Sequence, residues 1–196
     1  MKSHWYAILL LAAVCGCNAE SPEGMSSPVE VASTPEPAPA EVTTKVMDYT
    51  AIQMLIESYR GKVVVVDYWS TNCPPCIREL PGLVKLSQEF PASEVKCVTV
   101  SLDYTGAADE KPEDSTEAVM RILKHVDARF DNIIAADDSE AMLKKLDLSA
   151  PPAVYVYGKD GKLAKRFDNE NATGEGDEFT YAKDVQPLVA ELTQKK

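Results

Sequence analysis

A seven-residue run, Val63–Trp69, limits the possible folds of this chain more than any other segment. It consists of four valines followed by Asp, Tyr and Trp. β-Branched and aromatic residues favour strands, and a run with so little apolar–polar alternation is typical of a strand covered on both faces. Two cysteines, Cys73 and Cys76, come almost directly after it. The sequence therefore predicts a buried central strand that ends beside two closely spaced thiols.

The residues after Cys73 predict a helix. Apolar side chains recur with helical spacing from Pro74 to Phe90. Pro81 lies inside this segment, where it should kink the helix. The two thiols would then lie at the start of a helix, where the helix dipole favours a negative charge. Because such a pair can interconvert between dithiol and disulfide, a redox function is the leading interpretation.

The rest of the chain alternates between patterns typical of strands and of helices. Thr50 and Gln53 resemble a capping box that opens a helix over 51–60. Further strands are expected at 95–102, 132–136, 153–157 and 162–167, and further helices at 119–126, at 139–146 and near the C-terminus. Gly158 to Gly161 separate the last two strands and indicate a hairpin. This order predicts an α/β sandwich with a central mixed β-sheet.

The N-terminal residues indicate export. Lys2 precedes an apolar run that is too short for a bilayer, which needs about 20 residues, and matches a secretory signal peptide. The segment from Val14 to Cys17 resembles a bacterial lipobox, and Cys17 fits the lipidated position better than Cys15 because Gly16 precedes it. We therefore expect residues 1–17 to form a lipoprotein signal peptide with a lipidated Cys17. The alternative is an ordinary cleaved leader with two incidental cysteines.

Residues 18–44 differ sharply in composition from residues 45–196. They include five prolines and five glutamates but no lysine, arginine or aromatic residue. Such a composition buries too little apolar surface to offset the entropy of ordering, so we expect a disordered tether. Residues 45–196 suit a single domain. The chain carries a net charge of −11, and nothing in it suggests nucleic-acid binding, which needs a clustered basic surface.

The region from Gly61 to Pro81 resembles the active site of the thioredoxin superfamily, in its TlpA/ResA-like membrane-anchored branch. The matching positions are the cysteine pair, the tryptophan, the buried acid and the helix-kinking proline, here Cys73, Cys76, Trp69, Asp67 and Pro81. The resemblance implies a thioredoxin-like α/β/α sandwich.

A second region of resemblance lies far downstream. Ala150 to Ala153 precede an expected strand and resemble the family's cis-proline loop, with the cis residue at Pro152 and Pro151 as the near competitor. The family implies that Pro152 lies opposite the cysteines and presents the adjoining backbone to an extended substrate.

The chemistry of the pair can be argued from the residues themselves. Cys73, at the helix start, is the expected nucleophile, since a thiolate attacks a disulfide and a thiol does not. Cys76, one turn further in, should attack the mixed disulfide and release the partner. Asp67 lies on the same strand face as Trp69. A carboxyl buried there would have a raised pKa and could accept the proton of Cys76.

These features together predict an extracytoplasmic, lipid-anchored thiol–disulfide oxidoreductase. The resemblance implies a reductase that receives electrons from a membrane thiol transporter and acts on apocytochrome c or other oxidised proteins. We expect a monomer on the periplasmic side of a bacterial membrane. No cofactor or metal is expected, because the domain has three cysteines and one histidine and a structural zinc site needs four ligands.

Two alternatives belong to other classes. The two soft thiolates of Cys73 and Cys76 suit Cu(I), so a copper chaperone is one of them. The other is a peroxiredoxin-like thiol peroxidase, because peroxiredoxin relatives share the strand end at 101–103. Against it, Ser70 rather than threonine stands three residues before Cys73.

Three further residues receive plainer interpretations. Cys97 lies within an expected strand and is interpreted as an inert core thiol. His125 is placed on the polar side of a helix. Thr99 stands where thioredoxin itself carries a lysine beside the buried acid, so Asp67 is expected to be tuned differently here.

The double proline, Pro74 and Pro75, leads to a first prediction. Neither residue has a backbone N–H, so fewer donors than usual can stabilise a thiolate at this helix start. We expect Cys73 to be less acidic than it would be with a non-proline residue at 74. In Pro74→Ala, the pH midpoint of Cys73 alkylation should therefore fall below that of the wild type. An unchanged or higher midpoint contradicts this account.

Overall fold

The structure is a computed structural model that describes residues 41–170 and 176–195. Within them, six strands form one sheet in the order β1-β4-β3-β2-β5-β6. In chain order the elements are β1 (Lys45–Met47), α1 (Tyr49–Ser58), β2 (Val63–Trp69), α2 (Pro74–Glu89), β3 (Val95–Ser101), the 3₁₀ turn η1 (Pro112–Ser115), α3 (Thr116–Val126), β4 (Asp131–Ala135), α4 (Ser139–Leu146), β5 (Ala153–Tyr157), β6 (Leu163–Asp168), the π-helical turn η2 (Tyr181–Val185) and α5 (Gln186–Gln194). The predicted α/β sandwich with a mixed sheet is confirmed.

Strand β2 is the central strand that the sequence predicts. All seven of its residues are buried. It pairs in parallel with β3 and antiparallel with β5, which makes the sheet mixed. Both of its edges are hydrogen-bonded and both of its faces are covered, so its position in the domain is tightly constrained.

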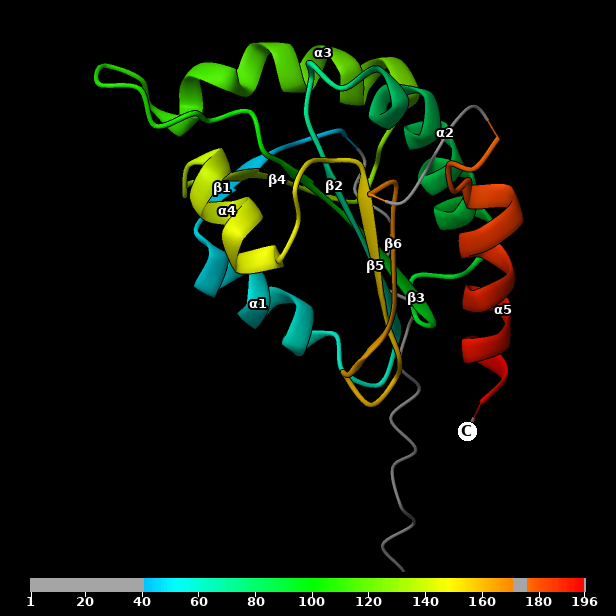
Figure 1. Cartoon of the computed structure of the whole chain (residues 1–196). Helices are drawn as coiled ribbons and strands as arrows, with labels where there is room; N and C mark the ends of the chain where they lie inside the picture. Colours follow the sequence, from blue (N-terminus) through cyan, green and yellow to red (C-terminus); the bar gives the residue numbers. More distant parts are fainter. Residues whose placement is uncertain (1–40, 171–175, 196) are drawn as a thin grey trace, which may run out of the picture. The chain divides into compact units, whose positions relative to one another are not determined.

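Helices cover the two faces of the sheet in separate groups (Figure 1). On one face, α1 and α4 pack on alternate residues of β2 with Ile52, Ile56, Met142 and Leu146, which meet Val64, Val66 and Tyr68. On the other face, α2 and the η2–α5 segment supply Leu83, Leu86, Val185 and Val189, which meet Val63 and Val65. Helix α3 adds Val119 and Leu123 to a cluster around Trp69. The alternation expected along β2 is therefore confirmed.

The start of α1 differs from the expected capping box. The helix begins at Tyr49, and its N-cap is Asp48, whose carboxylate accepts a hydrogen bond from the Ala51 N–H at 2.7 Å. Thr50 lies inside the first turn and is exposed. At an N-cap, aspartate and threonine both accept a hydrogen bond from a free helical N–H. The sequence pattern alone therefore did not distinguish Asp48 from Thr50, two residues later, as the residue that begins the helix.

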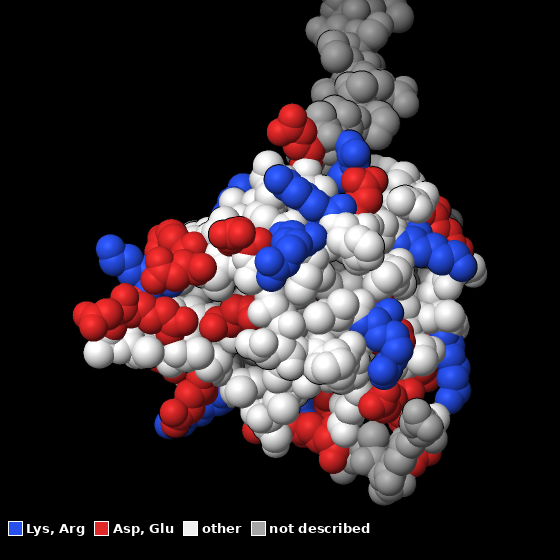
Figure 2. All heavy atoms as spheres, turned by 90° about the horizontal axis from the view of Figure 1, so that it is seen from above, with Lys and Arg blue, Asp and Glu red and all other residues white. Residues whose placement is uncertain are grey.

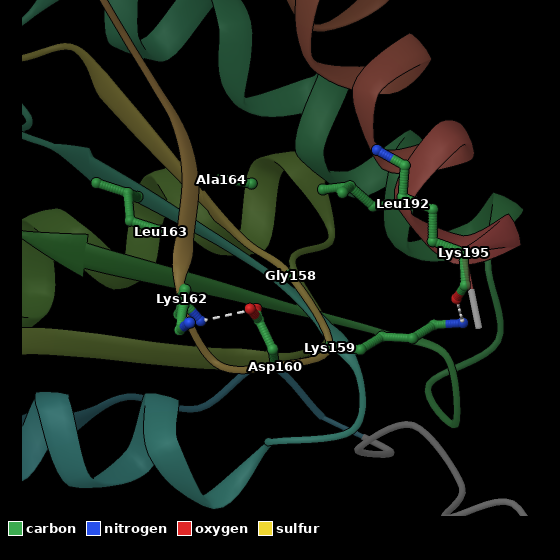
Figure 3. Close-up of a pocket in the computed structure, with 8 residues that line it drawn as sticks. All are labelled: Gly158, Lys159, Asp160, Lys162, Leu163, Ala164, Leu192 and Lys195. Carbon is green, nitrogen blue, oxygen red and sulfur yellow. Dashed lines mark hydrogen bonds between the residues drawn. The ribbon is translucent and has the colours of Figure 1, made fainter.

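The hairpin of β5 and β6 is confirmed and is tied to the C-terminal helix. Between the hairpin and α5 lies a groove of about 460 Å³. Figure 3 shows the side chain of Lys159 reaching across it. Its ammonium donates to the carbonyls of Thr193 and Lys195 at 2.7 and 2.8 Å. A lysine is favourable at this end of a helix, where carbonyls lack intrahelical partners.

The predicted leader, 1–17, and most of the predicted tether, 18–44, lie outside the described residues. In the part that the structure describes, no helix combines the length and the apolar character needed to cross a bilayer. Seen from above, the molecule shows positive and negative side chains interspersed with uncharged ones, and this face has no broad basic patch (Figure 2).

The cap of α1 gives a prediction with a matched control. Replacing Asp48 by alanine leaves a helical N–H without its acceptor and should lower the free energy of unfolding by about 1 kcal/mol. Thr50→Ala, two residues away and exposed, should change it by less than about 0.5 kcal/mol. Urea unfolding of both variants measures the difference. A larger loss of unfolding free energy in Thr50→Ala than in Asp48→Ala would mean that Thr50, and not Asp48, caps the helix.

Candidate active site

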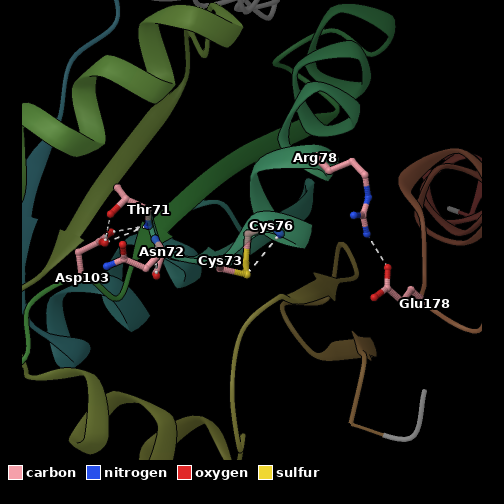
Figure 4. The surroundings of a disulfide bond; sticks show 8 residues. Thr71, Asn72, Cys73, Cys76, Arg78, Asp103 and Glu178 are labelled. Atoms are coloured by element: carbon pink, nitrogen blue, oxygen red, sulfur yellow. Dashed lines mark hydrogen bonds and ion pairs between the residues drawn. A yellow bond between two sulfur atoms is a disulfide. The ribbon is translucent and has the colours of Figure 1, made fainter. Parts of the chain in front are cut away.

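The two cysteines lie where β2 gives way to α2 (Figure 4). Cys73 is the N-cap residue of α2 and Cys76 lies one turn further in. Their sulfur atoms form a disulfide with a Cα–Cα distance of 5.3 Å. Cys73 is 8% exposed and Cys76 is 1% exposed. The outer sulfur is therefore the one that a partner can approach.

Few backbone donors face the sulfur atoms. Pro74 and Pro75 occupy the first two positions of α2 and have no N–H to offer. The N–H of Cys76 points to Cys73 Sγ, with 3.3 Å between nitrogen and sulfur. The next N–H, that of Ile77, donates to the carbonyl of Cys73 instead, at 3.1 Å. The first turn of α2 thus directs a single N–H to the sulfur of Cys73.

Asp67 carries a carboxyl into the covered interior of the sheet. The residue is 2% exposed. Burial raises its pKa from 3.8 to about 7, because the ionised form has lost its water. A hydrogen bond from the Tyr181 hydroxyl acts in the opposite direction, and the nearby charge of Glu79 adds a further rise. Such a carboxyl can both take up and release a proton near neutral pH.

The surroundings of Asp67 agree with the predicted strand face. It shares the α2-facing side of β2 with Trp69, and Trp69 packs in one cluster with Cys73, Cys76 and Leu80. In the neighbouring strands the residues paired with Asp67 are Thr99 and Val154. Neither carries a charge. The acid is thus grouped with the cysteine pair on one side of the sheet.

The proline loop adjoins the same end of β2. The Pro151–Pro152 peptide bond is cis, so Pro152 is the cis residue, as the sequence predicts. Pro152 is buried and directly precedes Ala153, which pairs with Tyr68. It therefore lies beside the strand end that leads to Cys73. Pro81 lies inside α2, as expected.

An aspartate just after β3 braces the loop before Cys73. The carboxylate of Asp103 accepts hydrogen bonds from the N–H and hydroxyl of Thr71, at 2.9 and 2.5 Å, and from the hydroxyl of Ser101 at 2.5 Å. Figure 4 shows Asp103 and Thr71 on the far side of the loop from α2. These contacts hold the backbone that leads to Cys73.

A surface ion pair lies on the other side of the disulfide. Arg78, in the first turns of α2, contacts Glu178 at 2.5 Å. Both side chains are exposed to a large extent, and such pairs contribute about 0–1 kcal/mol. The contact connects the start of α2 with the segment that leads to η2.

The structure also places the three residues that received plainer interpretations. Thr99 lies opposite Asp67, and its hydroxyl donates to Asn132 Oδ1 at 2.9 Å. Cys97 is a free, buried cysteine, and burial raises the pKa of its thiol. His125 is exposed.

Sequence reasoning missed Tyr181, Glu79 and Asp103. Tyr181 meets Asp67 across 114 residues of chain, and no local pattern signals such a contact. Asp103 had a signal, because polar residues at the end of a strand beside the central one often reach the same site.

Within the described residues, no group of three or more His, Cys, Asp or Glu side chains is arranged to hold a metal ion.

Comparisons with known proteins agree with this geometry. Residues 36–185 match the Redoxin family. The chain is 23% identical to the thiol-disulfide oxidoreductase ResA of Bacillus thuringiensis subsp. konkukian over 93% of its own length and 96% of the relative's. It is also 24% identical to the ResA of Bacillus subtilis over 56% of its length and 55% of that protein.

Solved structures show the same fold. A thiol-disulfide isomerase from Corynebacterium glutamicum aligns with a TM-score of 0.53 and 19% identity, covering 71% of this chain and 86% of that one. A secreted disulfide oxidoreductase from Mycobacterium tuberculosis aligns with a TM-score of 0.51 and 23% identity, covering 69% and 86%. The chain therefore belongs to the Redoxin family, with the thioredoxin-like fold and the paired cysteines of a thiol–disulfide oxidoreductase.

Proposed function

We propose that this protein is an extracytoplasmic, lipid-anchored thiol–disulfide oxidoreductase that reduces disulfides in other proteins. The observation that carries the proposal is the Cys73–Cys76 disulfide at the start of α2, on the same side of the sheet as the buried carboxyl of Asp67. The similarity to ResA, a thiol-disulfide oxidoreductase, supports the same reaction class.

The first step belongs to Cys73. In the reduced protein its thiolate attacks one sulfur of a partner disulfide, and the other partner sulfur leaves as a thiolate. A mixed disulfide between Cys73 and the partner results. The greater exposure of Cys73 and the N–H that points to its sulfur suit it to this role. Pro152 would present backbone to the incoming chain, and Trp69 and Pro81 would support the site.

The second step belongs to Cys76. Its thiolate attacks Cys73 Sγ, the intramolecular disulfide forms, and the partner leaves with both of its sulfurs reduced. Two electrons have then passed from the dithiol to the partner. Cys76 is buried, so it needs a base to take its proton, and Asp67 supplies one whose pKa of about 7 matches the task.

The N-terminal sequence supports a setting for the reaction outside the cytoplasm. The leader over 1–17 and the acidic, proline-rich segment over 18–44 support export, attachment through Cys17, and a spacer between the lipid and the domain at 45–196. Outside the cytoplasm thiols are kept oxidised. A reductase there depends on electrons from a membrane thiol transporter. Apocytochrome c and other oxidised exported proteins are the proposed substrates.

A redox titration and a trapping variant test the function together. We expect the reduction potential of the Cys73–Cys76 pair to resemble that of thioredoxin, about −270 mV, and not that of a strongly oxidising pair, about −120 mV. Cys76→Ser cannot complete the second step, so it should accumulate mixed disulfides with exported partners. Cys73→Ser is the matched control and should capture none. A strongly oxidising potential reverses the assigned direction, and a pair that does not cycle removes the function.

The buried acid predicts how stability depends on pH. The folded pKa of Asp67, about 7, exceeds its usual value of 3.8. Between these pH values the unfolded chain ionises at this site while the folded one does not, so the folded state loses stability as pH rises. The difference corresponds to roughly 4 kcal/mol above pH 7.

Asp67→Asn removes this dependence. The oxidised variant should be more stable than wild type by a few kcal/mol at pH 8 and nearly equal to it at pH 4, as measured by urea unfolding. Asp109→Asn, at an exposed position, is the control and should show neither effect. Equal gains at both pH values for Asp67→Asn would contradict the burial of an ionisable carboxyl.

A further inference from the structure

The two oxygen atoms of the Asp67 carboxyl have different surroundings. Oδ2 accepts a hydrogen bond from the Tyr181 hydroxyl at 2.7 Å, deep in the protein. Oδ1 is buried and has no hydrogen-bond partner in the part of the chain that the structure describes. A buried acceptor without a donor is costly, so its presence on the side of the sheet that carries the cysteine pair calls for an explanation.

Tyr181 is held firmly by the helix that carries the cysteines. It is 3% exposed, and its N–H donates to Glu79 Oε2 at 3.1 Å. Opposite its ring, α2 has a glycine. A Cβ on Gly82 would lie 2.4 Å from the Cβ of Tyr181, closer than real atoms approach. Glu79 and Gly82 lie three and six residues after Cys76, so one helix places both the resolving thiol and the tyrosine.

We propose that Tyr181 is a positioning residue for Asp67: its hydroxyl holds Oδ2 so that Oδ1 remains free to accept the proton of Cys76. This inference rests on the proposed function and assigns a role within the second step. When the mixed disulfide is resolved, the Cys76 S–H bond breaks and the proton passes to Oδ1. The electron pair left on the Cys76 sulfur forms the bond to Cys73 Sγ, while the bond between Cys73 and the partner breaks and the partner sulfur leaves as a thiolate.

The groups around the carboxyl make the hydroxyl a reliable donor. Burial raises the pKa of Tyr181 well above its usual value, so the hydroxyl keeps its proton throughout the working range. The titratable groups that face the pair are Glu79 of α2, whose charge raises the pKa of Asp67, and Cys97 of β3, whose thiol has a pKa raised by burial and keeps its proton. Thr99 and Val154, paired with Asp67 in the adjoining strands, are neutral.

Removing the hydroxyl therefore has a defined effect. The hydrogen bond lowers the pKa of Asp67, because it stabilises the ionised form. In Tyr181→Phe the base should become available only at higher pH. We expect the pH midpoint of the second step to rise by about one unit, a tenfold loss of rate below the midpoint. The first step, which Cys73 performs, should not change.

The reaction of the reduced protein with 5,5′-dithiobis(2-nitrobenzoate) separates the two steps. Attack by Cys73 releases one thionitrobenzoate anion, and attack by Cys76 on the mixed disulfide releases a second. The full chain with Cys15→Ser and Cys17→Ser avoids reaction at the leader. Stopped-flow measurement from pH 5 to 9 gives a midpoint for each phase. We expect Tyr181→Phe to shift only the second.

The control is Tyr155→Phe. Tyr155 is also buried and donates its hydroxyl to a backbone carbonyl, that of Leu146, at 2.5 Å. It packs on the opposite side of the sheet, so both midpoints should stay at the wild-type values. A shift as large as that of Tyr181→Phe would mean that loss of any buried hydroxyl suffices, and would overturn the proposal.

A double variant removes a merely structural explanation. In the Asp67→Asn background there is no carboxylate to position, so adding Tyr181→Phe should cause no further change in the second phase. An additional loss there overturns the proposal, as does an unchanged midpoint in Tyr181→Phe alone. If Tyr181→Phe does not fold, Gly82→Ala takes its place, because the added Cβ displaces the Tyr181 ring while the hydroxyl is kept. The midpoint of the second phase should then rise while that of the first stays the same, and an unchanged second midpoint overturns the proposal. Absence of a second phase in the wild type would instead refute the proposed function.

Discussion

A single buried strand sets the conditions for everything else in this domain. Every residue of β2 is shielded from water, and its four valines alone contribute several kcal/mol through the removal of apolar surface. Such a strand must have neighbours on both edges and helices on both faces. Its one carboxylic acid, Asp67, follows directly after the four valines and is buried with them. Its altered acidity is thus a direct result of where the strand lies.

Helix α2 converts this buried position into a site. Its N-cap presents Cys73, its first turn carries Cys76, and its later turns hold Tyr181 through Glu79 and Gly82. Both cysteines and the contacts that hold Tyr181 therefore come from one helix. Three strand ends complete the frame, those of β2, β3 and β5. The site depends on regular elements rather than on a long loop, which favours fixed geometry.

Sequence patterns predicted the parts of the structure that local chemistry decides. Strand β2, helix α2 and the β5–β6 hairpin have strong periodic or turn signals and were all confirmed. Strand β1 has only three residues, too few for a periodic pattern, and is held in the sheet by parallel pairing with β4. The π-helical turn at Tyr181 serves a contact with Asp67, 114 residues away. Contacts of this kind are set by tertiary packing, which a single sequence does not display.

Because Cys97 is buried in the folded domain, the reactivity of its thiol reports whether the domain is folded. From Lys45 onward the sequence has three cysteines. Two belong to the exchanging pair, and the third is 4% exposed in the middle of β3. In a reduced, folded domain only Cys73 should react directly with a reagent in solution, because Cys76 and Cys97 are both buried, whereas an unfolded domain should offer all three thiols. In an oxidising compartment the same arrangement keeps Cys97 from competing for a partner once the sheet has formed, so the order of folding and oxidation decides which disulfide results.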